Sequence, residues 1–442
     1  MLTTIPYIIL RVDLLVNIGR RGYIACIFFS INEGSFFLPL FAKIALGVVL
    51  GLRLDDPKEK LSLLSRGAEY DVLSPQGSFK KPTYPGICRV FARDGKCLSV
   101  LKTLFTNYCE NHCAYCVNRA QNDMPRVTFG PEEFAKLAYD LYRKGAIDGI
   151  FLSSGVLKDP DHTMELMIRA VKILRNNYGF KGYLHLKVLP GASEDLMREA
   201  VTLADRVSLN IEFTEETSFK LFTPEKRIDG LLADTIKLSR IVREARERGF
   251  KGKVGQSTQI IVGATGESDL SVLKTSLWLY RELEVSRVYY SAYVKVNADA
   301  PSPLGPFFPS LRERRLYQAD FLIRLYGFAL EEILPQGKSF LDRDIDPKLS
   351  WALRNLHLFP LEVTKASYEE LLRVPGIGPK SAKRIVEERG KVPLSLEVLK
   401  GFGVVVERAR SFITIKGRYF GDRAFPSIKW ERLEAGIQLS LL

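Results

Sequence analysis

The run Val100-Leu-Lys-Thr-Leu-Phe105 is followed, after three intervening residues, by Cys109-Glu-Asn-His-Cys113-Ala-Tyr-Cys116. The first run has the apolar character of a buried β-strand. Three of the six cysteines in the chain therefore fall within eight residues, in a loop that follows this strand. Thiolates are the ligands that proteins offer to zinc and to iron–sulfur clusters. The sequence thus predicts a metal centre with Cys109, Cys113 and Cys116 as ligands.

Two kinds of metal centre are compatible with this triplet. A closed structural zinc site takes four ligands, commonly in two separated pairs, and the chain has no second Cys-x-x-Cys. His112 or a distant residue would have to complete a zinc site; otherwise the three thiols would serve only for packing. In a cluster of four irons, three cysteines leave one iron open to a small chelating cosubstrate. We favour the cluster and expect Cys26, Cys88 and Cys97 to be small core residues.

Short apolar runs alternate with longer amphipathic ones downstream of the first strand. The predicted strands are 100–105, 149–154, 183–188, 206–213, 257–262 and 287–296. The predicted helices are 131–144, 163–177, 193–204, 231–248, 268–284 and 311–327. Repeated strand–helix units with right-handed crossovers build a parallel sheet. The fold class is therefore α/β, a partial (βα)6 barrel of TIM type, with ligands expected at the C-terminal ends of its strands.

Length and composition limit the class of protein. At about 150 residues per domain, 442 residues allow about three domains. The chain is 46% hydrophobic and 26% charged, which excludes a polytopic membrane protein and a largely disordered one. Its 64 Lys and Arg against 51 Asp and Glu give a net charge of +13, which favours polyanionic partners. Six cysteines are too few for a disulfide-stapled secreted domain, so we expect a reducing compartment, the cytoplasm.

The first 54 residues differ in character from the rest of the chain. An apolar run from residue 35 to residue 52 is interrupted only by Pro39 and Lys43. Three interpretations are open: a non-native extension before the true start, a membrane anchor, or a packed arm. Pro39 and Lys43 argue against a bilayer-spanning helix, so no membrane association is expected. The predicted division is extension 1–54, lead-in 55–97, barrel 98–330, linker 331–364, a small all-α hairpin domain 365–423 and tail 424–442.

A second informative stretch, residues 374 to 380, reads Val-Pro-Gly-Ile-Gly-Pro-Lys between two predicted helices. Its turn would present consecutive amide N–H groups at a helix N-terminus, which is a site for phosphate oxygens. The stretch closely resembles the helix-hairpin-helix motif, which binds the nucleic-acid backbone without reading sequence. An αα-hairpin used only for packing is the alternative. The residues expected to contact nucleic acid are Gly376, Ile377, Gly378, Lys380 and Lys383.

The cysteine triplet resembles that of the radical S-adenosylmethionine (radical SAM) superfamily, with an aromatic residue before the third cysteine and a βα barrel around it. The resemblance implies a 4Fe-4S cluster whose open iron is chelated by the amino and carboxylate groups of S-adenosylmethionine. It further implies that electron transfer from the cluster cleaves the sulfonium to a 5′-deoxyadenosyl radical, which abstracts hydrogen from the substrate. An external electron donor is therefore an expected partner.

The resemblance also implies where S-adenosylmethionine binds. The second strand ends in Ser-Ser-Gly, where the superfamily usually has Gly-Gly-Glu for the methionine amino group. The fifth strand resembles the pattern Gly-x-Ile-x-Gly-x-x-Glu, but Gln259 replaces the first glycine and Glu267 comes one position late. Polar residues alternate along the fourth strand and would meet the ribose or the carboxylate; a polar pair bonded within the barrel is the alternative. The candidate cofactor-binding residues are Tyr115, Ser153, Ser154, Gly155, Ser208, Asn210, Glu212, Ile261 and Gly263.

Barrel, triplet and hairpin together resemble a family of radical SAM proteins named for DNA modification or repair and associated with a partner like uracil-DNA glycosylase. The resemblance covers residues 55–422. It implies an enzyme that modifies or repairs nucleic acid, DNA rather than RNA. One alternative is a nucleic-acid-binding protein with a structural or redox-sensing iron–sulfur cluster. Another is a radical SAM enzyme that modifies RNA or tRNA, because phosphate contacts do not distinguish the two polymers.

Overall fold

A seven-stranded sheet, with its strands in chain order from β1 to β7, lies at the centre of the fold. The computed structural model describes residues 56–421 except 70, 73–84, 92–96, 250–253 and 307. The predicted extension 1–54 and tail 424–442 therefore lie outside the described residues. Strand β1 is antiparallel to β2, and every later neighbour is parallel. The strands are β1 (Ile87–Phe91), β2 (Cys97–Leu104), β3 (Gly149–Ser153), β4 (Tyr183–Lys187), β5 (Arg206–Ser208), β6 (Gly255–Val262) and β7 (Arg287–Ala292).

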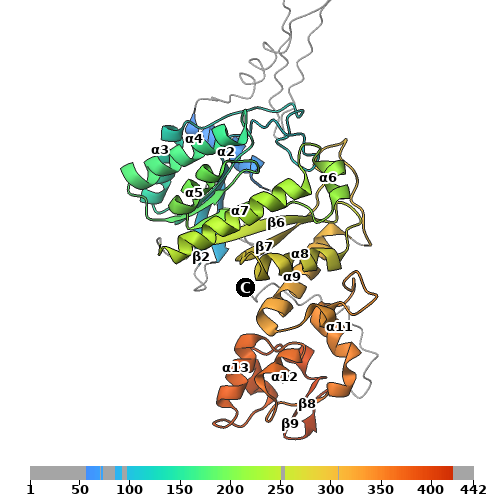
Figure 1. Ribbon diagram of the computed structural model, residues 1–442. Coiled ribbons are helices and arrows are strands. Elements are labelled where there is room, and N and C mark those ends of the chain that lie inside the picture. The colour runs from blue at the N-terminus through green and yellow to red at the C-terminus, as the bar shows by residue number, and fades with distance from the viewer. Residues whose placement is uncertain are drawn as a thin grey trace, which may run out of the picture. The chain divides into compact units, whose positions relative to one another are not determined.

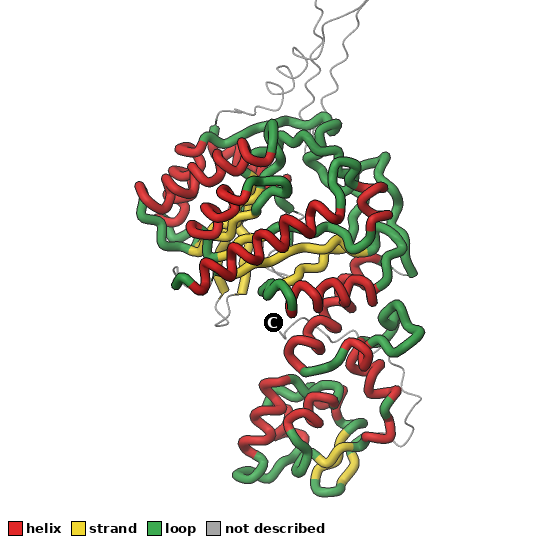
Figure 2. Tube along the Cα trace, in the orientation of Figure 1, coloured by secondary structure: helices red, strands yellow, loops and turns green. Residues whose placement is uncertain are grey.

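Helices connect the parallel strands and cover the sheet, which curls into a half-barrel (Figures 1 and 2). This part of the chain contains α2 (Pro57–Gly67), α3 (Pro131–Arg143), α4 (Pro160–Lys172), the π-helix η1 (Ile173–Asn177), α5 (Glu194–Leu203), α6 (Glu216–Phe222), α7 (Ile228–Glu247), α8 (Asp269–Arg281) and α9 (Pro309–Tyr326). Helix α3 packs against α4, α4 against α5, α5 against α7, and α8 against α9. The predicted α/β half-barrel with six parallel strands is confirmed.

The apolar periodicity of the sequence explains this core. Residues such as Ile150, Leu184 and Val207 are fully buried between the sheet and its helices. The helices begin where capping residues predict a start. Asp159 accepts a hydrogen bond from His162 N (2.7 Å) at the start of α4, and Ser268 accepts one from Ser271 N (3.0 Å) at the start of α8. Capping residues and buried apolar positions thus indicate the same helices and strands along the barrel.

The strand predicted for residues 206–213 is shorter in the structure. Regular pairing ends at Ser208, and only an isolated bridge between Glu212 and Ile260 follows. Glu212 has φ of 59°, a left-handed conformation that a non-glycine residue adopts only when its surroundings hold it there. The bend directs the Glu212 side chain into the cavity described below.

The C-terminal region is helical around the hairpin, as predicted, and also contains a small sheet that the sequence did not predict. Its strands are only two or three residues long, too short to show a hydrophobic period. The elements are α10 (Leu330–Ile333), α11 (Pro347–Arg354), the 3-10 helix η2 (Leu356–Leu358), β8 (Leu361–Glu362), α12 (Tyr368–Arg373), α13 (Pro379–Glu388), α14 (Leu396–Gly401), α15 (Val406–Ala409), β9 (Ile413–Ile415) and β10 (Arg418–Tyr419). In the described part of the chain, no helix combines the length and apolar character needed to cross a membrane.

Candidate functional site

The cysteine loop follows β2 and is fixed at several points by backbone hydrogen bonds. Glu110 N donates to Val156 O (2.9 Å), Gly155 N donates to Thr106 O (2.8 Å), and Ala114 N donates to Phe222 O (2.8 Å). The loop is therefore tied to the segment after β3 and to α6. This anchoring holds the three cysteines at the C-terminal end of the parallel strands.

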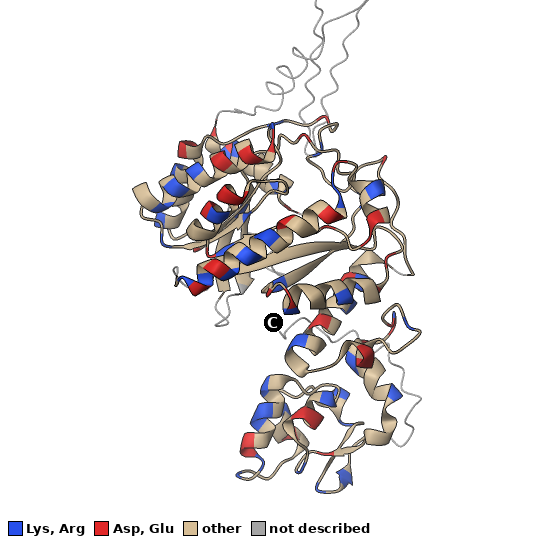
Figure 3. Cartoon of the chain, viewed as in Figure 1, with Lys and Arg blue, Asp and Glu red and all other residues tan. Residues whose placement is uncertain are grey.

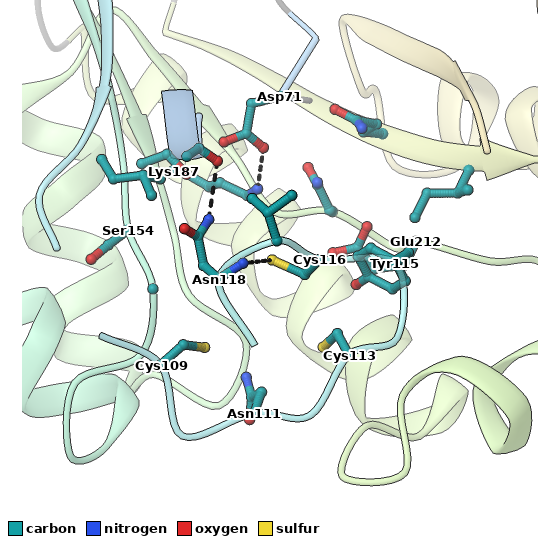
Figure 4. A pocket seen from close by; sticks show the side chains of 18 of the residues that line it. Asp71, Cys109, Asn111, Cys113, Tyr115, Cys116, Asn118, Ser154, Lys187 and Glu212 are labelled. Atoms are coloured by element: carbon teal, nitrogen blue, oxygen red, sulfur yellow. Dashed lines mark hydrogen bonds and ion pairs between the residues drawn. The ribbon is translucent and has the colours of Figure 1, made fainter. Parts of the chain in front are cut away.

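Cys109, Cys113 and Cys116 line one cavity at this end of the half-barrel. Figure 4 shows the sulfur atoms of Cys109 and Cys113 pointing toward each other across a common space, which Cys116 also borders. Cys113 is buried and the other two are half-buried. Cys116 Sγ accepts a hydrogen bond from Asn118 N (3.4 Å). The structure thus brings the predicted triplet together.

This donor set fits an iron–sulfur cluster better than a single ion. No three His, Cys, Asp or Glu side chains in the described residues lie close enough together to hold one metal ion. Each cysteine of a cubane binds a different iron, so its thiolates lie farther apart than the ligands of one ion. His112, the alternative fourth ligand, is half-exposed, pairs through Nδ1 with Glu225, and does not line the cavity.

The remaining cysteines lie elsewhere. Cys88 is half-buried beside Val100 in a small cluster inside the barrel, as expected of a core residue. Cys97 is exposed at the start of β2, so its assignment to the core is wrong. Cys26 lies outside the described residues.

Electrostatics around the triplet combine burial with one nearby cation. Burial raises the pKa of the Cys113 thiol and raises that of Cys116 to about 12, while Lys226 acts in the opposite direction on both. Lys226 Nζ lies 3.5 Å from Glu212 Oε1 and donates to Tyr115 Oη (3.3 Å). Burial alone would lower the pKa of Lys226, but attraction to Cys113 and Glu212 raises it. A cation therefore stands beside thiols that must lose their protons to bind iron.

Most of the predicted cofactor-binding residues border the same cavity. Those in its wall are Tyr115, Ser153, Ser154, Gly155, Asn210, Glu212 and Ile261. The structure does not bring Ser208 and Gly263 to this wall. Ser208 Oγ is 2.9 Å from His185 Nε2 inside the barrel, which is the bonded polar pair that the sequence left as an alternative. Gly263 has φ of 79°, and a Cβ there would lie 2.8 Å from Pro309, so it serves the turn after β6.

Two features of the wall suit a polar ligand. The buried hydroxyl of Ser154 and Oδ1 of Asn118 have no hydrogen-bond partner among the described residues, and both side chains line the cavity. Buried polar atoms of this kind ordinarily meet water or a ligand. At Gly155 the backbone of the cavity wall lies close to that of Tyr108. A Cβ at this position would lie 2.2 Å from Tyr108 O, so only glycine fits.

Sequence reasoning missed the charged residues on the other side of the cavity. Lys187, at the end of β4, forms an ion pair with Asp71 (2.5 Å). Burial opposes ionisation, but each partner stabilises the charge of the other: the pKa of Asp71 is lowered and that of Lys187 is raised. The alternation of Tyr183, His185 and Lys187 along β4 could have indicated that Lys187 points into the barrel. Asp71 follows α2 and carries no such signal.

Glu69, Asp71 and Val72, which we call the inner strut, are bound to three strands of the barrel. Lys102 Nζ donates to the carbonyl oxygens of Glu69 (2.9 Å) and Asp71 (3.1 Å). Gln259 Oε1 accepts from Val72 N (2.9 Å). Together with the Lys187–Asp71 pair, these contacts hold Asp71 in the cavity wall.

Glu267 does not line the cavity; it holds the loop after β6. Its carboxylate accepts from Gly263 N (2.6 Å) and Thr265 N (3.1 Å), and it pairs with Arg312 of α9 (2.9 Å). Arg312 is fully buried and also pairs with Asp269 (2.8 Å). The network fixes the turn that directly follows β6, the strand that carries Ile261.

We expect Arg312→Met to lower the free energy of unfolding by about 3–5 kcal/mol, because Glu267 and Asp269 would keep buried charges without their partner. Chemical denaturation monitored by circular dichroism would measure this change. Arg343→Met is the matched control, since Arg343 and its partner Asp344 are exposed; it should change stability by less than about 0.5 kcal/mol. Equal effects of the two substitutions would contradict the prediction.

The hairpin lies between α12 and α13. Ile377 is buried, and Gly376 adopts φ of 87° with no room for a Cβ, which would lie 2.5 Å from Val405 O. Lys348 Nζ donates to Ile377 O (2.6 Å) and draws this carbonyl inward. The amide N–H of Gly378 has no acceptor among the described residues, and Lys380 and Lys383 are exposed. Figure 3 marks the Lys and Arg positions of α13 in blue and its acidic positions in red.

Two family models match parts of the chain. Residues 103–279 match the family model described as the radical SAM superfamily, and residues 362–388 match that of the helix-hairpin-helix motif. No curated protein matches the sequence.

Several solved structures are similar to this chain. The FeFe-hydrogenase maturase HydG from Carboxydothermus hydrogenoformans is 14% identical, with a TM-score of 0.39 over 50% of each chain. Methylornithine synthase (PylB) is 17% identical, with a TM-score of 0.34 over 61% of this chain and 66% of that one. Coproporphyrinogen III oxidase (HemN) from Escherichia coli is 18% identical, with a TM-score of 0.32 over 49% of this chain and 50% of that one. The chain thus spans about half the length of HydG and HemN.

Proposed function

From a chain that carries a radical SAM domain and a helix-hairpin-helix motif, we propose an enzyme that modifies or repairs nucleic acid, with DNA as the first candidate. Radical SAM proteins use a 4Fe-4S cluster and S-adenosylmethionine. The observation that carries the proposal is the arrangement of Cys109, Cys113 and Cys116 around one cavity of the half-barrel. Three thiols for four irons leave a position for the cosubstrate.

Two groups of cavity residues would have different roles, one binding the cluster and the other binding S-adenosylmethionine. Cys109, Cys113 and Cys116 would hold the cluster, which when bound supplies the electron that cleaves S-adenosylmethionine. Ile261 offers apolar surface for the adenine, Tyr115 would offer its backbone to the adenine amino group, and Ser154 offers an unpaired hydroxyl for a polar group. An external electron donor would reduce the cluster beforehand.

The hairpin supplies the reason to propose nucleic acid as the substrate. The unpaired amide of Gly378 and the exposed Lys380 and Lys383 form a phosphate-binding surface at the start of α13. A nucleotide must leave its stack to enter a barrel, which costs a few kcal/mol. A backbone contact that ignores sequence can offset this cost. Cytoplasmic location and a partner like uracil-DNA glycosylase belong to the same proposal and rest on the family resemblance.

The test is chemical. Protein reconstituted anaerobically with iron and sulfide, then supplied with dithionite and S-adenosylmethionine, should release 5′-deoxyadenosine. An intact four-iron cluster without this product would contradict the enzyme and favour a structural or redox-sensing cluster. A comparison of modified nucleosides in DNA and RNA from wild-type and deletion strains would then distinguish a DNA substrate from an RNA or tRNA substrate.

A further inference from the structure

The segment of residues 395–409, which we call the second hairpin, repeats the pattern of residues 367–382, the first hairpin. Leucine, glycine, an apolar residue and alanine occur at identical spacings in both. The four positions are Leu372, Gly376, Ile377 and Ala382 in the first hairpin and Leu399, Gly403, Val404 and Ala409 in the second. The leucines, apolar residues and alanines are all buried. The family match to the helix-hairpin-helix motif ends at residue 388 and does not include the second hairpin.

The backbone follows the same repeat. Gly376 has φ of 87° and Gly403 has φ of 88°. Serine caps the first helix of each hairpin: Ser367 Oγ accepts from Glu370 N (3.1 Å) and Ser395 Oγ accepts from Val398 N (3.3 Å). The second helices, α13 and α15, both begin three positions after the left-handed glycine. Sequence pattern and conformation therefore define two copies of one unit.

The two copies pack against each other in a reciprocal way. A Cβ on Gly376 would lie 3.0 Å from Arg408 Cβ, and a Cβ on Gly403 would lie 3.2 Å from Ser381 Oγ. Ser381 and Arg408 occupy the same position of the repeat, in the first turn of α13 and α15. Each glycine thus faces the second helix of the other hairpin, as in a pair related by a local twofold axis.

The symmetry fails at the atoms that would contact phosphate. In the first hairpin the amide N–H of Gly378 has no acceptor among the described residues. The equivalent amide of the second hairpin, Val405 N–H, donates to Gly376 O (2.9 Å). The position of Lys380 is taken by an acid, Glu407, which lies 3.6 Å from Arg410. The second hairpin therefore lacks the open amide and one of the two cations, while the position of Lys383 is taken by Arg410, which pairs with Glu407.

We propose that the second hairpin has lost phosphate binding and instead rigidifies the first, so that the C-terminal region holds the backbone of one nucleic-acid strand. The inference rests on the proposed function, since it assumes that the first hairpin binds nucleic acid. Two equivalent hairpins related by a twofold axis could contact both antiparallel strands of a duplex. With one functional hairpin, the second strand adds no phosphate contact, and single-stranded nucleic acid binds as well as a duplex.

The first experiment compares the intact protein's affinity for a single strand and for a duplex of the same sequence and length, by fluorescence anisotropy. We expect the two dissociation constants to differ by less than about fivefold, with equal salt dependence. A larger preference for the duplex, with a steeper salt dependence, would overturn the inference while leaving the proposed function intact. Absence of salt-dependent binding to either probe would instead contradict the proposed role of the first hairpin.

The second experiment uses matched substitutions at equivalent positions of the repeat, Lys383→Glu and Arg410→Glu, which change the net charge equally. Lys383→Glu should weaken binding about fivefold or more. It should also flatten the slope of log affinity against log salt concentration by about one. Arg410→Glu should change affinity by less than about twofold, because Arg410 pairs with Glu407 and lies beside an amide, Val405 N–H, that already donates to Gly376 O. Equal loss in both variants would mean that both hairpins bind phosphate. Thermal unfolding verifies that each variant folds. The comparison of single-stranded with duplex nucleic acid tests the inference without any substitution.

Discussion

Replacing Cys109, Cys113 or Cys116 with alanine, one at a time, is expected to remove the iron–sulfur absorption at about 400 nm from the reconstituted protein. Each thiol faces the same cavity and would bind its own iron. Loss of one leaves two protein ligands, which cannot retain a cluster with an open iron. Formation of 5′-deoxyadenosine should fall by about 100-fold or more. Substitution of a residue that only hydrogen-bonds to a metal ligand already lowers metal affinity or activity by about 10–100-fold. Absorption spectra and product chromatography measure the two effects.

Cys88→Ala and Cys97→Ala are the matched controls, since they remove the same group outside the cavity. Cys88 donates a hydrogen bond to Val100 O (3.5 Å), and Cys97 is exposed. Both variants should keep the chromophore and the activity. Loss of the cluster in Cys97→Ala would indicate a closed site with four cysteines. Retention of the cluster in any triplet variant would remove that cysteine from the ligand set.

The double variant Lys380→Glu/Lys383→Glu is expected to bind every nucleic-acid sequence at least about tenfold more weakly. Both side chains are exposed beside the hairpin, so reversal of their charge repels phosphate without disturbing the core. The plot of log affinity against log salt should become flatter by about two, one for each lost phosphate contact. Anisotropy titrations at several salt concentrations, with two unrelated sequences, measure both quantities.

Lys136→Glu/Lys172→Glu provides a control with the same change of charge on α3 and α4, outside the hairpin. This control should bind nearly as well as wild type. If both doubles weaken binding equally, net charge alone governs affinity, and the hairpin is a packing element. Release of 5′-deoxyadenosine without nucleic acid, measured in the same samples, shows whether the hairpin region also affects the barrel.

The sequence predicted the parts of the fold that repeat a pattern. Apolar runs such as 149–154 and 183–188 are buried strands because both faces of a parallel sheet are covered. The triplet was recognisable because its three thiols are close in sequence. The hairpin was recognisable for the same reason, since its turn and its two helices form one continuous segment.

The parts that escaped prediction depend on contacts between distant segments. Asp71 and Lys187 meet across 116 positions, and neither residue is unusual in its own segment. The left-handed conformation of Glu212 requires the neighbouring strand, whose Ile261 N donates to Glu212 O (2.7 Å). Residues 100–105 predict a strand, but nothing in them indicates the antiparallel partner β1. Tertiary packing, rather than local propensity, decides these features.

The inner strut has a practical consequence for work with fragments of this protein. A truncated form that begins at residue 98 would contain every strand of the parallel sheet, yet it would lack Asp71 and the carbonyl oxygens that hold Lys102. Lys187 would then lose the carboxylate with which it pairs directly, a change that costs about 3–5 kcal/mol in comparable buried pairs. The half-barrel should therefore be expressed from the start of α2, because Asp71, which precedes the sheet, neutralises the charge of Lys187 within it.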